Sequence, residues 1–510
     1  MSDSRVAALL RSDSPLVLIE APAGCGKTYQ GAAYASEAST TIGNGRVLIL
    51  THTHAACGVF ATRTSGNRSR VCVRTIDGLI GEIAAVYHKA LDLPPDPAIW
   101  AWRDNGLGFP IMAKRVAALL ERSPMVAEAL SKRFPIVVCD EHQDSSTDQH
   151  LVAMALHQAG SSLRIFADPM QRIYGEKTEK AADAERQRWE ALKKTADFDR
   201  LSTPHRWKDD SPALGDWIMQ ARIDLERGAA IDLTRPLPPT VRLIFGTNRS
   251  RSHRQYRLTG QERRELDVAV RASKQLLVLG PKNDIVDSLC GFWNRSIPLW
   301  EGHTRSALAV LVSKIQEANG DALALATAMI EFIGSVSIGF TRKSHGERLL
   351  QEISEGCSKK SRGKPAAIQE VGRHFLGTPS HMSIGSALEA IDRFVTERNP
   401  GFAEVKIDRR VEFRDAIRVC RFENVDDGFA RVSGMRSHGT SSPPSRALST
   451  IHKAKGLECD DVVVVACDRD HLRGTSYARC VLYVALSRAK KSLTLVVSKD
   501  EPSPLFRLEA

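Results

Sequence analysis

The sequence predicts an α/β protein with two parallel β-sheets, each interrupted by a helical insertion. Three observations support this fold class. Short apolar, strand-like runs alternate with helical stretches in the N-terminal part, a phosphate-binding pattern follows the first run, and similar runs return near the C-terminus. With 510 residues, 42% of them hydrophobic, the chain is long enough for several domains with their own cores.

The first sheet is predicted from apolar runs that are short enough to be strands. These runs are residues 16–19, 47–50, 71–73, 136–139 and 163–166. Their alternation with helical stretches is typical of a doubly wound parallel sheet. The helical stretch 81–133 contains Trp100 and Trp102 but no motif, and it is interpreted as an insertion. The first domain is therefore expected to comprise residues 1–80 and 134–205.

A second sheet is predicted to begin at residues 276–279 and to be completed by the apolar runs 462–466 and 493–497. Between them, residues 303–444 are mostly helical in pattern and form the second expected insertion. The segment TSSPPS, at 440–445, is interpreted as the linker that returns to the sheet. The second domain is therefore expected to comprise residues 206–302 and 445–510.

A phosphate-binding loop follows the first predicted strand. Its pattern is A-x-x-x-x-G-K-T, with Ala21 where glycine is usual. The predicted nucleotide-binding residues are Ala21, Pro22, Ala23, Gly24, Cys25, Gly26, Lys27 and Thr28. In such a loop, backbone N–H groups surround the phosphates, the lysine reaches the β/γ oxygens, and the threonine hydroxyl holds Mg²⁺. A chance glycine-containing turn is the alternative, and nucleoside triphosphate binding is the favoured interpretation.

Two adjacent carboxylates, Asp140 and Glu141, come directly after the predicted strand 136–139. Ligands of parallel α/β sheets bind at the carboxyl ends of the strands. Because unpaired buried carboxylates are costly, this pair points to chemistry more than to packing. Asp140 is predicted to hold Mg²⁺, and Glu141 to take a proton from the attacking water.

The segment 140–144, DEHQD, is similar to the DExQD box of UvrD/Rep/PcrA-type superfamily 1 helicases. Further segments match that family's motifs in the family's order. They are LILTHTHAAC at 48–57, the TxD element at 75–77, FADPMQRIYG at 166–175, TPHRW around Arg206, TIHKAKGLECDDVVVV at 450–465, and VLYVALSRAKKSL at 481–493. The chain thus resembles this family over nearly its whole length.

The resemblance implies two RecA-like motor domains with ATP in the cleft between them, and Mg²⁺ as cofactor. Gln171 would sense the γ-phosphate, and Arg206 and Arg488 would neutralise charge in the transition state. Tyr174 would lie near the nucleotide base or the DNA, and Glu458 near the ribose and the DNA path. The implied DNA-binding residues are Thr51, His52, His54, Thr75, Asp77 and His452. Lys455 is either a plain loop lysine or a direct contact.

The implied partner is single-stranded or partly duplex DNA, along which the family moves in the 3′-to-5′ direction. The chain departs from the family at several positions. No glutamine that could read adenine occurs in residues 1–15, and His52 and His54 replace phenylalanine and asparagine. Glu176 follows Gly175 where relatives have a stacking tryptophan, and stacking contributes about 1–3 kcal/mol per base. ATP hydrolysis is therefore predicted more firmly than processive unwinding.

The compact plan is similar to that of the helicase-like subunit of the Gabija anti-phage system, which works beside an OLD-family nuclease. No nuclease-type group of carboxylates is evident, so cleavage would need such a partner. Two hypotheses stay open: a DNA-dependent ATPase and helicase in DNA repair or anti-phage defence, or a DNA- or nucleotide-sensing regulatory NTPase that controls a nuclease.

Charge and cysteine usage are consistent with both hypotheses. The 71 Lys and Arg residues exceed the 60 Asp and Glu residues, and the net charge of +11 suits a partner that carries phosphates. Basic runs at 242–257 and 342–364 are either solvated loops or DNA-backbone contacts. The ten cysteines form no C-x-x-C pair, which favours a reducing compartment. With no apparent signal peptide or membrane span, the expected location is the cytoplasm.

Overall fold

The computed structural model describes residues 2–102, 106–175, 178–246, 258, 260–293, 296–300, 306–359, 362–437 and 444–508. The chain divides into two compact units. One comprises Met1–Leu91, Met112–Trp300 and Thr440–Ala510 and contains both large sheets; the other comprises Asp92–Ile111 and Glu301–Gly439. The finer division into four domains at residues 81, 134, 206, 303 and 445 stays a proposal.

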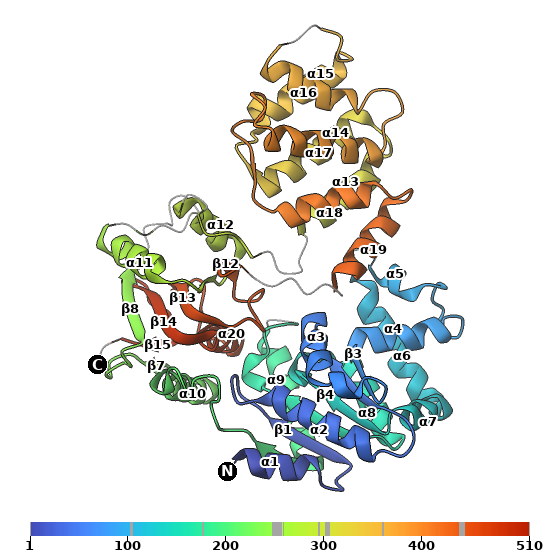
Figure 1. Ribbon diagram of the computed structural model, residues 1–510, viewed down its shortest axis with the longest axis vertical. Coiled ribbons are helices and arrows are strands. Elements are labelled where there is room, and N and C mark those ends of the chain that lie inside the picture. The colour runs from blue at the N-terminus through green and yellow to red at the C-terminus, as the bar shows by residue number, and fades with distance from the viewer. Residues whose placement is uncertain are drawn as a thin grey trace. The chain divides into compact units, whose positions relative to one another are not determined.

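The first sheet has six parallel strands in the order β3-β2-β4-β5-β1-β6 (Figure 1). The strands are β1 Leu16–Glu20, β2 Val47–Thr51, β3 Val71–Thr75, β4 Ile136–Cys139, β5 Ser162–Ala167 and β6 Asp197–Arg200. The five predicted strands are confirmed. Strand β6, with the sequence DFDR, was not predicted because it is a polar and partly exposed edge strand without an apolar run.

One face of this sheet is covered by helices α1 (Ser2–Leu10), α2 (Lys27–Thr41) and α3 (His54–Arg63). Val17 and Ile19 of β1 point to this face and share a core with residues of all three helices. Helices α4 (Ile76–Val86), α6 (Gly108–Arg122), α7 (Pro124–Arg133), α8 (Thr147–Gln158) and α9 (Glu179–Thr195) complete this part of the chain. The strand order places β4, β5 and β1 side by side, so the loops that follow them meet at one edge of the sheet.

The second sheet has five parallel strands in the order β12-β9-β13-β14-β8. The strands are β8 Val241–Gly246, β9 Leu276–Gly280, β12 Arg446–Thr450, β13 Cys459–Cys467 and β14 Ala489–Ser498. The three predicted runs lie in β9, β13 and β14. The two edge strands, β8 and β12, were not predicted. A small separate sheet pairs β7 (Ile231–Asp232) with β15 (Phe506–Arg507).

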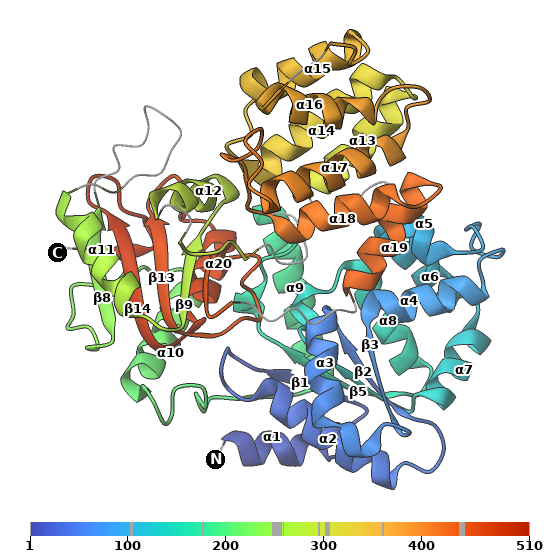
Figure 2. The same ribbon diagram turned by 45° about the horizontal axis from the view of Figure 1, so that its top comes forward.

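Successive residues of the second sheet point to opposite faces, and each face has its own helices (Figure 2). Leu277 and Val462 pack in a core with α10 (Pro212–Glu226) and α20 (Ser476–Leu486). Leu276 and Val463 pack in a second core with α11 (Gly260–Ala272) and α12 (Asn283–Phe292). Burial on both faces explains why the central strands read as continuous apolar runs.

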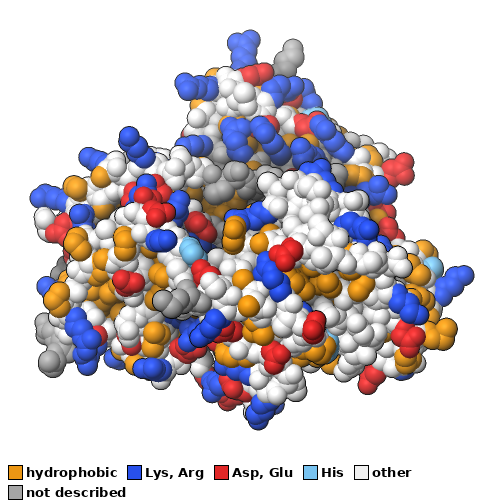
Figure 3. All heavy atoms as spheres, turned by 60° about the horizontal axis from the view of Figure 1, so that its bottom comes forward, with side chains coloured by type: hydrophobic (Ala, Val, Ile, Leu, Met, Phe, Trp, Pro, Cys, Tyr) orange, Lys and Arg blue, Asp and Glu red, His pale blue; other side chains and the backbone are white. Residues whose placement is uncertain are grey.

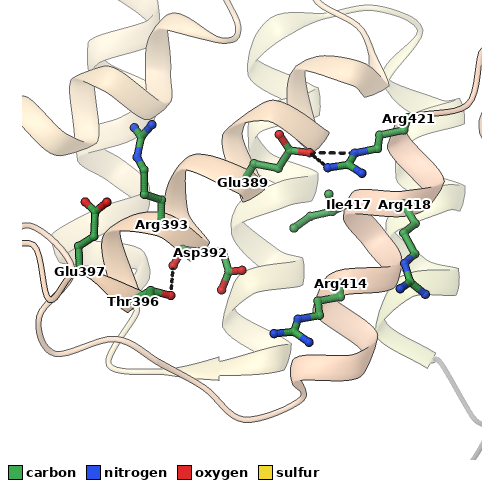
Figure 4. A pocket seen from close by; sticks show the side chains of 9 residues that line it. All are labelled: Glu389, Asp392, Arg393, Thr396, Glu397, Arg414, Ile417, Arg418 and Arg421. Atoms are coloured by element: carbon green, nitrogen blue, oxygen red, sulfur yellow. Dashed lines mark hydrogen bonds and ion pairs between the residues drawn. The ribbon is translucent and has the colours of Figure 1, made fainter.

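The second unit is helical, with one short antiparallel pair, β10 (Ser337–Ile338) and β11 (Lys406–Ile407). Its helices are α5 Pro97–Trp102, α13 Ser306–Ala318, α14 Ala322–Val336, α15 Glu347–Ser354, α16 Lys364–Arg373, α17 His381–Thr396, α18 Arg410–Cys420 and α19 Val425–Ser437. A groove of about 420 Å³ between α17 and α18 is lined by charges of both signs (Figure 4).

The structure describes much of the second basic run but little of the first. Residues 247–257 of the first run lie outside the described residues, and so do 360 and 361 of the second. In the rest of the second run, Arg348, Lys359 and Lys364 form ion pairs with neighbouring glutamates. On the face shown in Figure 3, lysines and arginines are interspersed with acidic side chains. Among the described helices, none has the length and apolar character that crossing a membrane requires.

Candidate nucleotide site

The phosphate-binding loop joins β1 to α2. Gly24 and Gly26 have left-handed φ values of 75° and 83°. A Cβ on Gly24 would lie 2.8 Å from the Trp207 ring, so this position needs glycine for its space as well as its conformation. Ala21, by contrast, does not have a positive φ, and its N–H donates to the Ala167 carbonyl at 2.9 Å. Alanine therefore replaces the usual glycine here without backbone strain.

Helix α2 starts at Lys27 and has no side-chain hydrogen bond at its N-cap, Gly26. The N–H groups and the dipole of such a helix start favour an anion. Ala21, Pro22, Ala23 and Cys25 are buried, whereas Gly24, Gly26, Lys27 and Thr28 are partly accessible. The loop thus presents its lysine and threonine beside an open helix start, as phosphate binding requires.

Asp140 and Glu141 follow β4 and face the loop. The Lys27 ammonium forms an ion pair with Glu141 and lies 3.5 Å from Oδ1 of Asp140. Burial raises the pKa of Asp140 to about 6, although Lys27 opposes this shift. Burial would also raise the pKa of Glu141, but Lys27 and Lys455 lower it well below its usual range. Glu141 has a left-handed φ of 53°, which fixes an uncommon side-chain direction.

The residues around Asp140 fit a divalent cation. Its buried Oδ1 atom has no close hydrogen-bond donor in the described protein, and the Lys27 ammonium at 3.5 Å is the cation beside it. A buried carboxylate oxygen without a partner is costly unless a positive charge lies beside it. Thr28, in the first turn of α2, is the second candidate ligand. An oxygen-rich donor pair of this kind is what Mg²⁺ prefers.

We call the part of the chain around the six-stranded sheet the first lobe and the part around the five-stranded sheet the second lobe. Gln171, in the first lobe, contacts a residue of the second. Its Nε2 donates to Asp168 at 2.9 Å, and its Oε1 accepts from Nη2 of Arg488 at 3.3 Å. Arg488 is 3% exposed and also donates to the backbone oxygens of Leu457 and Val484. Burial lowers the pKa of Arg488 to about 10, so the guanidinium is still charged at neutral pH.

Arg206 lies directly beside the phosphate-binding loop. Its N–H donates to the Gly24 carbonyl at 3.1 Å, and its guanidinium bonds to Glu458 and to the Ser487 carbonyl. Its Nε atom is buried and makes no hydrogen bond within the described protein, so one donor remains for a ligand. The structure therefore brings together Lys27, Glu141, Gln171, Arg206, Arg488 and Glu458, the residues that the sequence assigned to the nucleotide.

Several contacts between the lobes were not predicted. Lys455 donates to Asp144 at 2.5 Å and to the Gln171 carbonyl at 2.7 Å. Both are contacts within the protein, so a direct contact of Lys455 with a ligand stays a prediction. The Tyr483 hydroxyl accepts from the Ala23 N–H at 2.9 Å. The sequence offered one signal for Tyr483, its place in the VLYVALSRAKKSL segment.

Tyr174 lies near Lys455 and His452. Its ring centre is 5.0 Å from the Lys455 ammonium, and its hydroxyl donates to the His452 carbonyl at 3.2 Å. At 43% exposed, the ring is available to a ligand. Glu176, which follows it and bears on DNA stacking, lies outside the described residues.

The DNA-binding candidates of the first lobe follow β2 and β3. Thr51 and Thr75 are register partners in these strands, and both are buried. Thr75 uses its hydroxyl to cap α4, and Thr51 bonds to the Thr53 carbonyl. His52 instead bonds to Ser145, directly after the DEHQD segment, and Asp77 bonds to Gln149 of α8. His54 begins α3, and the ring of His452 bonds to Tyr477.

We expect ATP hydrolysis to depend on pH through the two carboxylates with raised pKa. Burial raises the pKa of Asp144, like that of Asp140, to about 6. A raised carboxyl pKa means that the charge is present above this pH and lost below it, so metal binding weakens in acid. The steady-state rate, measured from pH 5 to 8, should fall below about pH 6, and added Mg²⁺ should restore part of it. A flat profile would contradict this.

Comparison with protein families agrees with the motif order. Residues 100–181 match the UvrD/REP helicase N-terminal domain, and residues 447–496 match the UvrD-like helicase C-terminal domain. No curated protein sequence matches the chain. The first match includes the DEHQD segment and Gln171, and the second includes Glu458 and Arg488.

Proposed function

Because the chain belongs to the UvrD/Rep type of superfamily 1 helicases, we propose that it is a DNA-dependent ATPase that translocates 3′-to-5′ on single-stranded DNA. The observation that carries this proposal is the convergence of Lys27 and Glu141 from one lobe with Arg206 and Arg488 from the other. Two lobes that share one triphosphate can convert its hydrolysis into relative motion.

Each charged group has a distinct role in the proposed reaction. Lys27 holds Glu141 in an ion pair, and a triphosphate would draw the lysine toward its own oxygens. Glu141 would then be free to orient water and accept its proton. Mg²⁺ held by Thr28 and Asp140 would neutralise charge on the β- and γ-phosphates. The low pKa of Glu141 keeps the carboxylate ionised at neutral pH.

The arginines would respond to charge that develops during hydrolysis. Arg206 has a buried Nε donor that bonds to none of the described residues, and Arg488 contacts Gln171 directly. Release of products would weaken these contacts and let the lobes separate. If single-stranded DNA lies across the residues that follow β2 and β3, alternating closure would become stepping along the strand.

Two assays test the proposed function. Single-stranded DNA should raise the ATPase rate, and ATP should drive strand release from a duplex with a 3′ overhang but not from one with a 5′ overhang. Lys27→Ala, which removes the phosphate-binding ammonium, is the inactive control. An ATPase rate that DNA leaves unchanged would contradict the proposal.

DNA-stimulated hydrolysis without strand release would instead favour the second hypothesis, a regulatory NTPase that controls a partner nuclease. DNA repair and anti-phage defence are the two pathways in which either activity would serve. A nuclease that co-purifies with the chain, together with the absence of strand release, would decide for the regulatory form.

A further inference from the structure

The segment that follows the candidate general base is hydrogen-bonded to two of the DNA-binding candidates of the first lobe, His52 and Asp77. Directly after Glu141, the chain forms a short 3₁₀ helix, His142–Asp144, and then enters α8. Side chains between positions 142 and 150 contact His52 after β2 and Asp77 after β3. None of these connecting residues belongs to the nucleotide contacts described above.

The first connection is a chain of four hydrogen-bonded side chains. His52 Nε2 lies 3.0 Å from Ser145 Oγ, which lies 3.3 Å from His142 Nδ1. His142 Nε2 in turn lies 3.0 Å from His150 Nδ1. Ser145 and His142 are both buried, with 5% of each residue exposed. The chain therefore runs from the loop after β2, through the DEHQD segment, to α8.

Buried neutral histidines make this chain directional. Burial lowers the pKa of His52 and of His150 to about 4. A neutral imidazole has one donor and one acceptor nitrogen, and the Ser145 hydroxyl can donate to one histidine while it accepts from the other. In that arrangement all donors in the chain point the same way. A ligand that fixes the proton position on His52 would fix the orientation of the whole chain.

The second connection is independent of the histidines. Gln149 donates from Nε2 to Oδ1 of Asp77 at 2.7 Å. Its Oε1 accepts from the Ser146 N–H at 2.9 Å and forms a capping box at the start of α8. The chain at the start of α8 thus contacts His52 after β2 and Asp77 after β3, which the sequence assigned to DNA binding.

We propose that Ser145, His142 and Gln149 are positioning residues that couple DNA binding to the orientation of the Glu141 carboxylate. The coupling rests on the proposed function, because it needs DNA at His52 and Asp77 and hydrolysis at Glu141. Its mechanical basis is the left-handed backbone at Glu141, where a small rotation of the following residues redirects the carboxylate. Gln143, in the same short helix, also bonds to Glu141 and carries the displacement to it.

The test is Ser145→Ala in the full chain, which removes the central hydroxyl and both of its hydrogen bonds. The ATPase rate is measured with and without oligothymidine. We expect the rate without DNA to stay within about twofold of wild type, and the stimulation by DNA to fall by about fivefold or more. Ser161→Ala is the matched control, because it deletes a buried hydroxyl that bonds only to the Phe134 carbonyl in the described structure.

A second variant tests the other connection. Gln149→Glu keeps an oxygen that can accept from the Ser146 N–H but cannot donate to Asp77. It should lower DNA stimulation as Ser145→Ala does. Because coupling is reciprocal, each variant should also reduce the effect of DNA on the affinity for a non-hydrolysable ATP analogue.

The outcomes separate this inference from the proposed function. Wild-type hydrolysis that DNA does not stimulate would refute the proposed function, and the coupling with it. Wild-type stimulation that persists unchanged in Ser145→Ala and Gln149→Glu would refute the coupling alone. Equal losses of the basal and the stimulated rate would also refute it, because Ser145 would then only support the fold around Glu141.

Discussion

Glu141→Gln is expected to slow ATP hydrolysis by about 10²–10⁴-fold, the contribution typical of a general base. Glutamine has nearly the same size and keeps one acceptor oxygen for Lys27, although its NH2 group cannot accept from Gln143, so the fold around β4 should be preserved. It cannot accept a proton from water. Nucleotide affinity, measured by titration with a fluorescent ATP analogue, should stay close to that of wild type, because the phosphate-binding groups are unchanged.

A matched control separates this effect from a general loss of a carboxylate. Glu37 forms an exposed ion pair with Arg11 in the same lobe, and Glu37→Gln should leave hydrolysis unchanged. If Glu141→Gln kept more than a tenth of the wild-type turnover, another group would have to act as the base. The assignment of Glu141 would then be wrong.

The central strands of both sheets could be predicted from sequence because burial on both faces requires apolar residues at nearly every position. Strands β1 and β9 are buried at all five of their residues. The edge strand β3 has part of this signal in its apolar run 71–73, but the edge strands β6 and β8 were not predicted. In β8 the burial alternates irregularly and the apolar run is only residues 243–245, whereas β6 is exposed or only partly buried throughout and has no apolar run.

The sequence predicted which residues form the nucleotide site, but it did not predict most of the contacts between them. The motif residues at Lys27, Asp140 and Glu141 follow strands β1 and β4, and this placement alone brings them to one edge of the sheet. The Lys455–Asp144 pair joins residues 311 positions apart, and the Tyr483–Ala23 hydrogen bond spans 460 positions. Such pairs depend on how two lobes pack, which local sequence patterns do not encode.

The histidines at positions 52 and 142 illustrate a further limit. From the sequence, His52 was one of several departures from the family pattern, and together these made processive unwinding a weaker prediction than ATP hydrolysis. The structure gives it a partner in Ser145 and connects it to the DEHQD segment. From its own motif, His52 looks like the loss of a family residue. Its contact with Ser145 can be recognised only when the three-dimensional structure places the two segments side by side.

Arg206→Ala is expected to lower the turnover number by about 10³-fold or more, as removal of a transition-state arginine does. Arg206 suits this test better than Arg488, because its removal disturbs fewer buried contacts. Arg488 is 3% exposed and satisfies the backbone oxygens of Leu457 and Val484, so its removal would also leave buried acceptors unpaired. Arg206 is nearer the surface, and its removal frees one backbone acceptor, the Ser487 carbonyl, while its other partner, Glu458, has a 45% exposed side chain that can turn to water.

The ratio of effects on turnover and on KM identifies the role of Arg206. A group that acts mainly in the transition state lowers kcat and leaves KM nearly unchanged, whereas a nucleotide anchor raises KM. Arg206→Lys should restore little, since lysine cannot reproduce the planar, multidentate guanidinium that now joins Glu458 and the Ser487 carbonyl. Arg11→Ala removes an exposed arginine of the first lobe and should alter neither constant. An increase in KM at constant kcat would assign Arg206 to binding and leave Arg488 as the arginine that responds to hydrolysis.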